Sequence, residues 1–434
     1  MLSYSSNFSC FCINIITFVM EYLFVTNDLS ILFTETKFMK QRFYSLDVFR
    51  GATVCLMIMV NNPGNWSHIY APLDHAEWHG VTPTDLVFPF FLFAVGNALA
   101  FVMPRLETAG AATFWKKVIK RTLLIFLIGL FLNWMPFVKW DDGALVFKPW
   151  SYINDNGQPA GIRILGVLQR IALAYFFASV LIYFLKARGA FFAGCVILLG
   201  YWFLCVAGNP ADPYSFFGWF GTSIDKSILG EAHMYHGEWR NGHPVAFDPE
   251  GFMSLFGAIV QVIFGYLVGD YIVKKGKTPE MVNGLFVAGA VFLFAGYAWD
   301  MVFPINKKIW TSSYVVYTTG LAMVIIAVMI YLIELKNHRG WLSKFFDVFG
   351  KNPLFIFVLS GVLPRLLGLI RIPTTDAMGN ADYTTPFGWF YEHICRPLFG
   401  SNLNNGSLFY ALCMITFYWL IVYWMDKKKI YIKV

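Results

Sequence analysis

Apolar residues dominate this chain in long blocks that short polar segments separate. A membrane-spanning helix needs about 20 mostly apolar residues, and the blocks approach this length. From residue 39 onward, the pattern predicts about ten membrane-spanning helices. They are expected at residues 46–60, 85–103, 117–135, 164–185, 190–207, 252–272, 283–303, 313–334, 345–363 and 408–425. The predicted fold is an all-α polytopic membrane protein.

Residues 1–38 fit this pattern poorly. Residues 8–25 are apolar but contain Asn14 and Glu21, and no basic residue precedes them. A secretory signal normally begins with a basic segment, so this is a poor match for one. Two interpretations stay open for residues 1–38, an extension without function or a weak extra helix. Residues 39–434 form the predicted transmembrane domain.

Lysine and arginine are distributed unevenly between the two sides of the predicted membrane. If residue 39 is placed inside, most basic residues fall in short inner segments, whereas the long segments 61–84, 136–163, 208–251 and 364–407 fall outside. Basic loops tend to stay in the cytoplasm, so both ends of the core are expected there and the four long loops are expected to be extracytoplasmic.

Composition supports this class of protein. The chain is 57% hydrophobic and only 14% charged, which is too apolar for a soluble protein, so the lipid bilayer is an expected partner. The net charge of +7 is explained as a topology signal, and no nucleic-acid partner is expected. The seven cysteines lie mostly inside apolar blocks. We therefore expect no disulfide framework and no metal site.

One segment, Leu73–Pro89, concentrates polar groups at the start of a predicted span, with the sequence LDHAEWHGVTPTDLVFP. Titratable groups at such a place are costly and mark functional sites. Thr82 is expected to cap the following helix, with Pro83 at its first position and Asp85 answering Thr82 in a capping box. His75 can take and release a proton near neutral pH.

Each polar residue of this segment also has a structural interpretation. His75 is either an acid–base group or a hydrogen-bonded loop histidine. Asp85 either orients His75 and fixes its tautomer, or serves only as the helix cap. Glu77 and His79 are ordinary loop residues or substrate contacts, and Trp78 is an interfacial anchor or a substrate contact.

Other polar residues stand beside predicted helix ends on the outer side. Asn61 ends the first span, where its amide can donate to an oxyanion or simply be a polar terminal residue. Asp248 and Glu250 flank a proline before a predicted helix, which suits either capping or binding of an amine or hydroxyl. Trp310 lies in the segment that leads into the span 313–334.

The inner side carries a second set. Arg50 follows Asp47 by three residues, so the two can pair on one helix face, unless Arg50 holds a phosphate. Basic and polar residues also occur at Arg121, Lys351 and Asn352. Arg170 lies within an apolar block and needs either a carboxylate partner, such as Asp47 or Asp300, or an anionic ligand. Polar groups on both faces suit a donor that arrives from one side and an acceptor from the other.

Several motifs occur in a fixed order: SLDVFRG, MVNNPGNW, HAEWHGVTPTDLVFPFFLF, GVLQRIALAYF, FDPEG and PINKKIWTSSY. Together they resemble the heparan-α-glucosaminide N-acetyltransferase family of polytopic transmembrane acyltransferases, from about Arg42 to Lys351. The resemblance implies acetyl-CoA as the donor on the cytoplasmic side and a terminal glucosamine-like amine of a glycan as the acceptor on the outer side. The family's catalytic histidine falls on His75 and its assisting asparagine on Asn61, and the family suggests a homodimer.

The resemblance implies a multi-pass acetyltransferase of the bacterial inner membrane. His75 would act as general base or carry the acetyl group, Asn61 would polarise the thioester carbonyl, and Asp85 would orient the catalytic turn. The expected substrate contacts are Glu77, Trp78, His79, Asp248, Glu250 and Trp310. The expected contacts of the co-substrate are Arg50, Arg121, Arg170, Lys351 and Asn352.

Other functions stay open at this point. The chain departs from the family in residues 208–246 and 371–407, so the acceptor could equally be a cell-wall amino sugar or a hydroxyl of an envelope polysaccharide, which would make the protein an O-acetyltransferase. A polytopic transporter of a sugar or an anionic small molecule would also suit the spans and their polar residues. A non-catalytic membrane module that handles polysaccharide is the third class.

Overall fold

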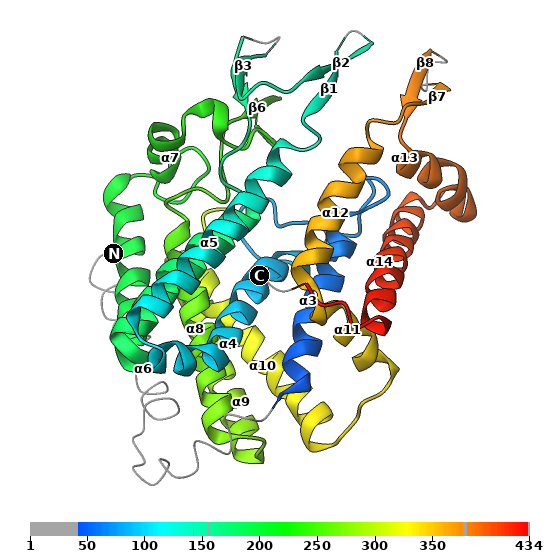
Figure 1. Cartoon of the computed structure of the whole chain (residues 1–434). Coiled ribbons are helices and arrows are strands. Elements are labelled where there is room, and N and C mark those ends of the chain that lie inside the picture. The colour runs from blue at the N-terminus through cyan, green and yellow to red at the C-terminus, as the bar shows by residue number, and fades with distance from the viewer. Residues whose placement is uncertain (1–41, 142, 155–156, 241, 376–379, 433–434) are drawn as a thin grey trace.

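The computed structural model describes residues 42–432 except 142, 155–156, 241 and 376–379. Helices make up most of this part of the chain (Figure 1). Residues 1–38 lie outside the described residues, so both interpretations of them stay predictions.

Each predicted span coincides with a helix or a helix pair. The main helices are α3 (Tyr44–Asn61), α4 (Val87–Thr108), α5 (Ala111–Trp134), α6 (Val167–Gly208), α8 (Leu255–Lys275), α9 (Pro279–Asp300), α10 (Ser312–Ile330), α11 (Trp341–Lys351), α12 (Pro353–Leu367) and α14 (Leu403–Lys427). The shorter ones are η3 (Ala71–Leu73), η4 (Pro83–Leu86), α7 (Gly221–Leu229), η5 (Glu231–His233), η6 (Tyr331–Leu335), α13 (Pro386–Phe390), η7 (Tyr391–Cys395) and η8 (Pro397–Phe399).

The number of spans differs from the prediction. Among the described residues, six helices are long and apolar enough to cross a membrane, or seven if α11 and α12, bent by 76° to each other, form one span. α3 has only 18 residues and includes Asp47 and Arg50. A polytopic membrane protein is therefore supported, whereas the predicted count of about ten spans and the position of both ends in the cytoplasm are not confirmed.

α6 is a hairpin of two helices. A straight helix of 42 residues would be about 63 Å long, roughly twice the thickness of the bilayer core. The helix breaks at Lys186, where φ is 58°. The Arg170 guanidinium lies 5.0 Å from the centre of the Trp310 ring, and the Tyr201 hydroxyl donates to the Ile309 carbonyl at 2.5 Å. Ile309 and Trp310 are adjacent in the sequence, yet they contact opposite halves of α6. The chain must therefore reverse at Lys186, as the two predicted spans 164–185 and 190–207 require.

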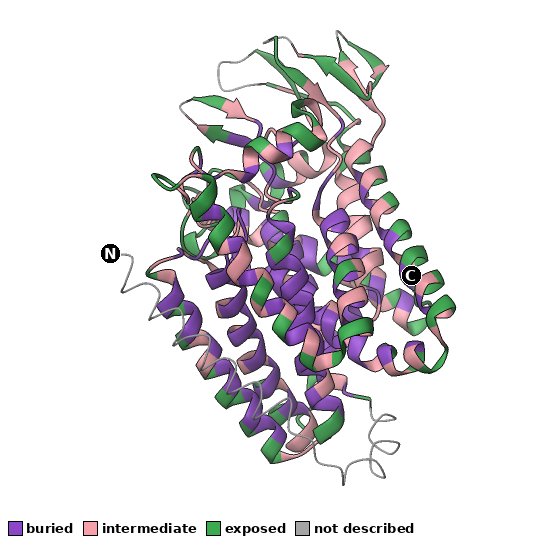
Figure 2. Ribbon diagram, turned by 90° about the vertical axis from the view of Figure 1, so that its left-hand side faces the viewer, coloured by how far each residue is buried: buried purple, intermediate pink, exposed green. Residues whose placement is uncertain are grey.

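α8 forms the centre of the helical body. In its apolar stretch of 18 residues, 89% of the residues are buried. The helix packs against α4 and α6. Glycines allow α4 and α8 to approach closely, since a Cβ on Gly96 would lie 2.1 Å from the Val262 carbonyl oxygen and a Cβ on Gly265 would lie 2.3 Å from that of Phe93. Figure 2 shows the buried residues gathered in the interior and the exposed ones on the outward helix faces. α4 is thus a firmly packed support for the segment that precedes it.

The all-α description is incomplete, because four two-stranded antiparallel hairpins are present at one end of the molecule (Figure 1). They pair β1 (Val138–Asp141) with β2 (Ala144–Phe147), β3 (Ser151–Ile153) with β4 (Pro159–Gly161), β5 (Glu238–Arg240) with β6 (His243–Val245), and β7 (Ile372–Thr375) with β8 (Ala381–Thr384). Strands this short show too little alternation of polar and apolar residues to be recognised in a sequence. We call this end of the molecule the hairpin end.

The four loops predicted to be extracytoplasmic contact one another at the hairpin end. The Trp78 indole N–H donates to the Tyr214 carbonyl at 2.8 Å, and the Asn65 N–H donates to the Ser407 hydroxyl at 3.1 Å. The Trp140 indole of β1 donates to a carbonyl just after α12. These contacts form one layer that covers the ends of the membrane helices.

Candidate active site

A histidine–aspartate pair lies in the segment Leu73–Pro89. Nδ1 of His75 is 2.7 Å from Oδ1 of Asp85. The imidazole is 45% exposed, whereas the carboxylate is only 2% exposed. An Asp85 carboxylate at this place favours the tautomer with hydrogen on Nδ1, which leaves the Nε2 lone pair free. The ring therefore offers an oriented basic nitrogen at an open surface.

Asp85 also caps a helix, so both of its predicted roles occur together. η4 begins after Thr82 with Pro83 at its first position, and Oδ2 of Asp85 accepts the Thr82 N–H at 3.1 Å. The same oxygen accepts the Ala76 N–H at 3.0 Å and the Thr82 hydroxyl at 3.1 Å. Three donors thus hold Oδ2 and leave Oδ1 directed at His75.

The turn that follows His75 is fixed from the other side by the segment between α9 and α10. Gly80 has φ of +103°, a conformation that glycine adopts without strain. Its N–H donates to the Ile305 carbonyl at 2.7 Å. The Tyr314 hydroxyl of α10 donates to the Asp85 carbonyl at 2.5 Å. Segments more than 200 residues apart in the sequence therefore meet here.

Lys307 brings a positive charge to the pair. Its ammonium lies 3.3 Å from Oδ1 of Asp85 and 3.1 Å from Nδ1 of His75. Burial lowers the pKa of Lys307 from its ordinary value, and the charges of Asp85 and Glu250 oppose that effect. The next residue, Lys308, turns away to Glu238, with 2.9 Å between the ammonium and the carboxylate.

The remaining predicted contacts in this segment differ in exposure. Glu77 and His79 are exposed. Nδ1 of His79 lies 3.5 Å from the Asn306 amide nitrogen, and burial of part of the ring lowers the pKa of His79. Trp78 is half-buried and packs edge-on against Phe216 and Phe247. Trp78 thus anchors the turn, while Glu77 and His79 face the surface.

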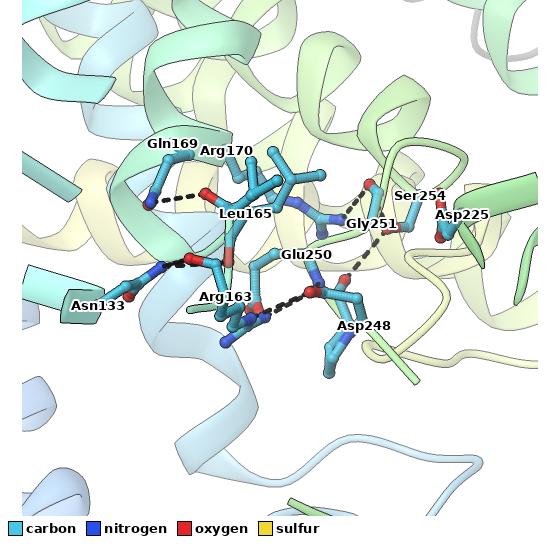
Figure 3. A network of polar contacts seen from close by, with 12 residues as sticks. Asn133, Arg163, Leu165, Gln169, Arg170, Asp225, Asp248, Glu250, Gly251 and Ser254 are labelled. Atoms are coloured by element: carbon cyan, nitrogen blue, oxygen red, sulfur yellow. Dashed lines mark hydrogen bonds and ion pairs between the residues drawn. The ribbon is translucent and has the colours of Figure 1, made fainter. Parts of the chain in front are cut away.

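A second charged cluster surrounds Arg163 (Figure 3). Its guanidinium donates to both oxygens of Asp248, at 3.0 and 2.5 Å, and also to Glu250. Burial alone would raise the pKa of Glu250, but the positive charges of Arg163, Arg170 and Lys307 hold it below its ordinary value. The two carboxylates predicted to bind substrate are therefore already paired with a cation.

A cavity of about 660 Å³ lies at the hairpin end, between α3, α5, α6 and α12. Its polar lining residues are Asn61, Asn62, Asn133, Arg163, Gln169, Tyr235, Ser360 and Arg365. No hydrogen bond to the Asn61 amide is present within the described part of the chain. That amide is free to donate to a bound molecule. His75 does not line this cavity. It contacts Lys307, whose charge lowers the pKa of Glu250.

A second cavity, of about 370 Å³, lies toward the opposite end of the helices. Three predicted contacts of the co-substrate line it together, namely Arg50, Arg121 and Lys351. Val167, Leu168 and Phe357 belong to the walls of both cavities, so the two spaces adjoin. Polar groups from both ends of the molecule thus border two adjoining cavities.

Comparison with known proteins shows which family this chain resembles. A profile described as heparan-alpha-glucosaminide N-acetyltransferase, catalytic, matches residues 42–229. The human heparan-alpha-glucosaminide N-acetyltransferase is 26% identical over 372 residues, which cover 73% of this chain and 52% of that protein. The mouse protein of the same name is 25% identical over 378 residues, covering 74% and 54%. The chain therefore spans about half the length of the curated relatives it matches.

The chain is related to the heparan-α-glucosaminide N-acetyltransferases. This confirms the resemblance that the motifs indicated. The profile match contains Asn61, His75 and Asp85, and it also contains Arg163 and Arg170.

The sequence predicted carboxylate partners for Arg50 and Arg170, and the structure shows only the first of these pairs among the residues it describes. Arg50 does pair with Asp47, with 3.3 Å between Nη1 and Oδ1. Arg170 makes no ion pair within the described residues. Its guanidinium instead donates to the Ser254 hydroxyl and to the Gly251 carbonyl (Figure 3). The predicted carboxylate partner of Arg170 is therefore wrong. A polar turn before α8 accepts from one guanidinium nitrogen, Nη2, while Nε and Nη1 have no hydrogen-bond partner among the described residues.

Arg170, Trp310 and Asn352 lie apart from the cavities. Trp310 is 1% exposed and lies beneath the Arg170 guanidinium, so its face does not reach a surface. Asn352 is fully buried, and its amide bonds the backbone of Ile430 and Ile432, which holds the end of the chain against α11. Their proposed roles in binding stay predictions.

Sequence reasoning missed two residues that the structure places beside the predicted ones. Arg163 was not linked to Asp248 and Glu250, although it lies three residues before the motif that contains Arg170. Lys307 was noted within its motif without a role. The signal was weak in both cases, because 85 and 232 residues separate these side chains from their partners Asp248 and His75.

Proposed function

We propose that this chain is a membrane acetyltransferase that moves an acetyl group from acetyl-CoA to the amine of an amino sugar. The observation that carries the proposal is the His75–Asp85 pair, in which one ring nitrogen is held and the other is free. It falls inside the segment matched by a catalytic profile of acetyltransferases.

His75 acts as the general base through Nε2. The acceptor nitrogen attacks the thioester carbonyl carbon, a C–N bond forms, and the C–S bond breaks. Nε2 takes the proton that the nitrogen loses, and the resulting imidazolium returns it to the leaving sulfur, so the balance is one amide and one thiol. Asp85 stabilises the imidazolium between these two steps, because its buried oxygen lies 2.7 Å from Nδ1.

Asn61 supplies the neutral donor in this proposal. It is the last residue of α3, it borders the larger cavity, and its amide is free. A donor of this kind stabilises the oxygen on which charge builds up, and its removal typically costs about 10²–10³ in rate.

The smaller cavity suits the donor, acetyl-CoA. The phosphates of this co-substrate need cations, and three line the wall. Lys351 is held by Asp347 and Asp426 at 2.7 and 3.0 Å, and Arg50 by Asp47. Arg121 makes no ion pair within the described residues and lies 4.8 Å from the centre of the Tyr175 ring, so no carboxylate neutralises its charge. The thioester would extend through the shared wall toward Asn61.

The larger cavity suits the acceptor. Amide, hydroxyl and aromatic side chains line it, which is the chemistry that binds sugars. Arg365 stands at its border without a carboxylate within ion-pair distance in the described residues, and it donates only to the Gly361 carbonyl of its own helix. Burial and the Arg365 charge both lower the pKa of nearby Lys148. This unbalanced positive charge favours an acceptor that carries an anionic group.

In this proposal the hairpin end faces outward and the smaller cavity opens to the cytoplasm of a bacterium, with the protein in its inner membrane. The support is the concentration of basic residues away from the hairpin end and the position of Arg50, Arg121 and Lys351. A homodimer stays a prediction from the family.

The test uses purified protein, labelled acetyl-CoA and a panel of glucosamine derivatives, with His75→Gln and Asn61→Ala compared with the parent protein. We expect loss of transfer by about 10³ or more for His75→Gln and by about 10²–10³ for Asn61→Ala. Mass spectrometry of His75 after a pulse without acceptor tests the other route, because a trapped acetyl-histidine would show that the ring carries the group. Full transfer by a folded His75→Gln variant would exclude the proposal.

A transporter is the second candidate, because two adjoining cavities that extend toward opposite ends would also suit alternating access. Sealed vesicles separate the two. A transporter moves a labelled sugar or anion across the membrane without acetyl-CoA, whereas the acetyltransferase releases thiol only when both substrates are present.

A further inference from the structure

The imidazole of His75 has two polar neighbours at the same ring nitrogen. Nδ1 lies 2.7 Å from the Asp85 carboxylate and 3.1 Å from the Lys307 ammonium. A ring nitrogen either carries a hydrogen or offers a lone pair. Nδ1 can therefore donate to Asp85 or accept from Lys307, but it cannot do both at one time.

The two neighbours act on the protonation of the ring in opposite directions. A carboxylate 2.7 Å away favours the doubly protonated imidazolium. In that form Nε2 has no lone pair and cannot take a proton from an acceptor. An ammonium at 3.1 Å from the ring and 3.3 Å from the carboxylate disfavours the imidazolium and offsets part of the negative charge.

We propose that Lys307 is a positioning residue that offsets the charge of Asp85 beside His75, so that Nε2 stays available as a base. The inference rests on the proposed function, in which His75 is the base. Asp85 supplies the orientation and the stabilisation of the imidazolium, and Lys307 limits how strongly Asp85 holds that proton before the substrates react.

The position of Lys307 supports this role. Its side chain is 22% exposed, so solvent screens its charge only in part. Gly80 pairs with the segment that carries it, which fixes the backbone near His75. The charge of Glu250 also attracts the ammonium, and Arg163 donates a hydrogen bond to Glu250. The ammonium thus contacts one carboxylate, Asp85, and the ring nitrogen.

The charged groups that face this pair come from three segments. Asp74 and Asp85 belong to the segment that contains His75, and Asp74 accepts the backbone N–H of His75 at 2.8 Å. Lys307 and Lys308 belong to the segment after α9, and Glu250 precedes α8. Of these five, Asp85 and Lys307 contact the imidazole in the described structure.

The experiment compares the parent protein with Lys307→Met, Lys307→Arg and Lys308→Met. Lys308→Met is the matched control, because Lys308 is the adjacent lysine but pairs with Glu238. Two quantities are measured as functions of pH: kcat/KM for acetyl transfer, and the rate at which diethyl pyrocarbonate modifies His75, followed by peptide mass spectrometry. The reagent modifies neutral imidazole, so the second measurement does not depend on activity.

In Lys307→Met, the midpoints of both profiles are expected to move to higher pH by about 1 unit or more, since a charge within about 4–6 Å shifts a titration by that amount. Lys307→Arg keeps the charge and should keep the midpoints near those of the parent, as should Lys308→Met. A merely structural role of Lys307 would lower activity at every pH and leave the midpoints in place, and would refute the inference.

The two proposals fail in different ways. If the modification profile shifts in Lys307→Met but no acetyl transfer occurs in the parent protein, the pairing is supported and the proposed function is wrong. If transfer depends on His75 but neither profile shifts in a folded Lys307→Met variant, the role of Lys307 is wrong and the acetyltransferase remains.

Discussion

Asp85→Asn tests the catalytic pair most sharply, because the replacement changes the tautomer of His75 while it preserves the shape of the site. Oδ2 of Asp85 accepts three hydrogen bonds, from the Ala76 N–H, the Thr82 N–H and the Thr82 hydroxyl. An asparagine must place its oxygen there. Its amide nitrogen then occupies the position of Oδ1, faces Nδ1 of His75, and donates a hydrogen to it.

The consequence is a histidine with its hydrogen on the wrong nitrogen. Nδ1 accepts from the amide, so Nε2 carries the hydrogen and loses its lone pair. The buried charge that stabilised the imidazolium is also gone. The same substitution in a serine protease triad leaves the geometry intact and lowers kcat by about 10⁴ through the wrong tautomer. We expect a loss of about 10³–10⁴ in kcat here, with little change in the KM for either substrate.

The assay is single-turnover acetyl transfer in detergent, with thermal melting to verify the fold. Asp74→Asn serves as the control, since Asp74 accepts the His75 backbone N–H but does not touch the ring. We expect less than about a tenfold loss for it. If a folded Asp85→Asn variant keeps more than one-tenth of the parent kcat, the tautomer argument is refuted and Asp85 is only a helix cap.

Three further predictions follow from individual groups. Arg121→Gln should raise the KM for acetyl-CoA by about tenfold with little change in kcat, and an unchanged KM would remove Arg121 from the donor site. Arg163→Met should lower stability by about 3–5 kcal/mol by chemical denaturation, because it leaves two carboxylates partly or fully buried without a cation, and a loss below about 1 kcal/mol would contradict that. Burial raises the pKa of Asp225 from 3.8 to about 6, so the contribution of Asp225 to stability should fall as pH rises from about 4 to 6; Asp225→Asn should make the melting temperature fall less, or rise more, over this range than in the parent protein, and an unaltered slope would oppose it.

Local patterns made part of this site predictable. Thr82, Pro83 and Asp85 lie within four consecutive positions, so their helix-start chemistry could be recognised in the sequence and occurs as expected. His75 is only 10 residues from Asp85. The grouping of Arg50, Arg121 and Lys351 beside one cavity agrees with their predicted side of the membrane, although their role there stays a prediction.

Contacts between distant segments could not be predicted in the same way. Lys307 contacts His75 because the segment between α9 and α10 lies at the hairpin end. The spacing of apolar residues along the sequence does not predict this contact. Arg170 lies in an apolar block, which indicated an ion pair, but a carbonyl and a hydroxyl from the turn before α8 accept from its Nη2 instead. The strands of three and four residues lacked a recognisable pattern.

The most direct test is transfer across a sealed membrane. Proteoliposomes with one orientation would hold labelled acetyl-CoA on the side of the smaller cavity and a glucosamine acceptor on the side of the hairpin end. We predict acetylated acceptor on the hairpin side with the parent protein, and a loss of about 10³ or more with His75→Gln. Product formed at the same rate by both proteins, or formed only when donor and acceptor share one side, would contradict the account.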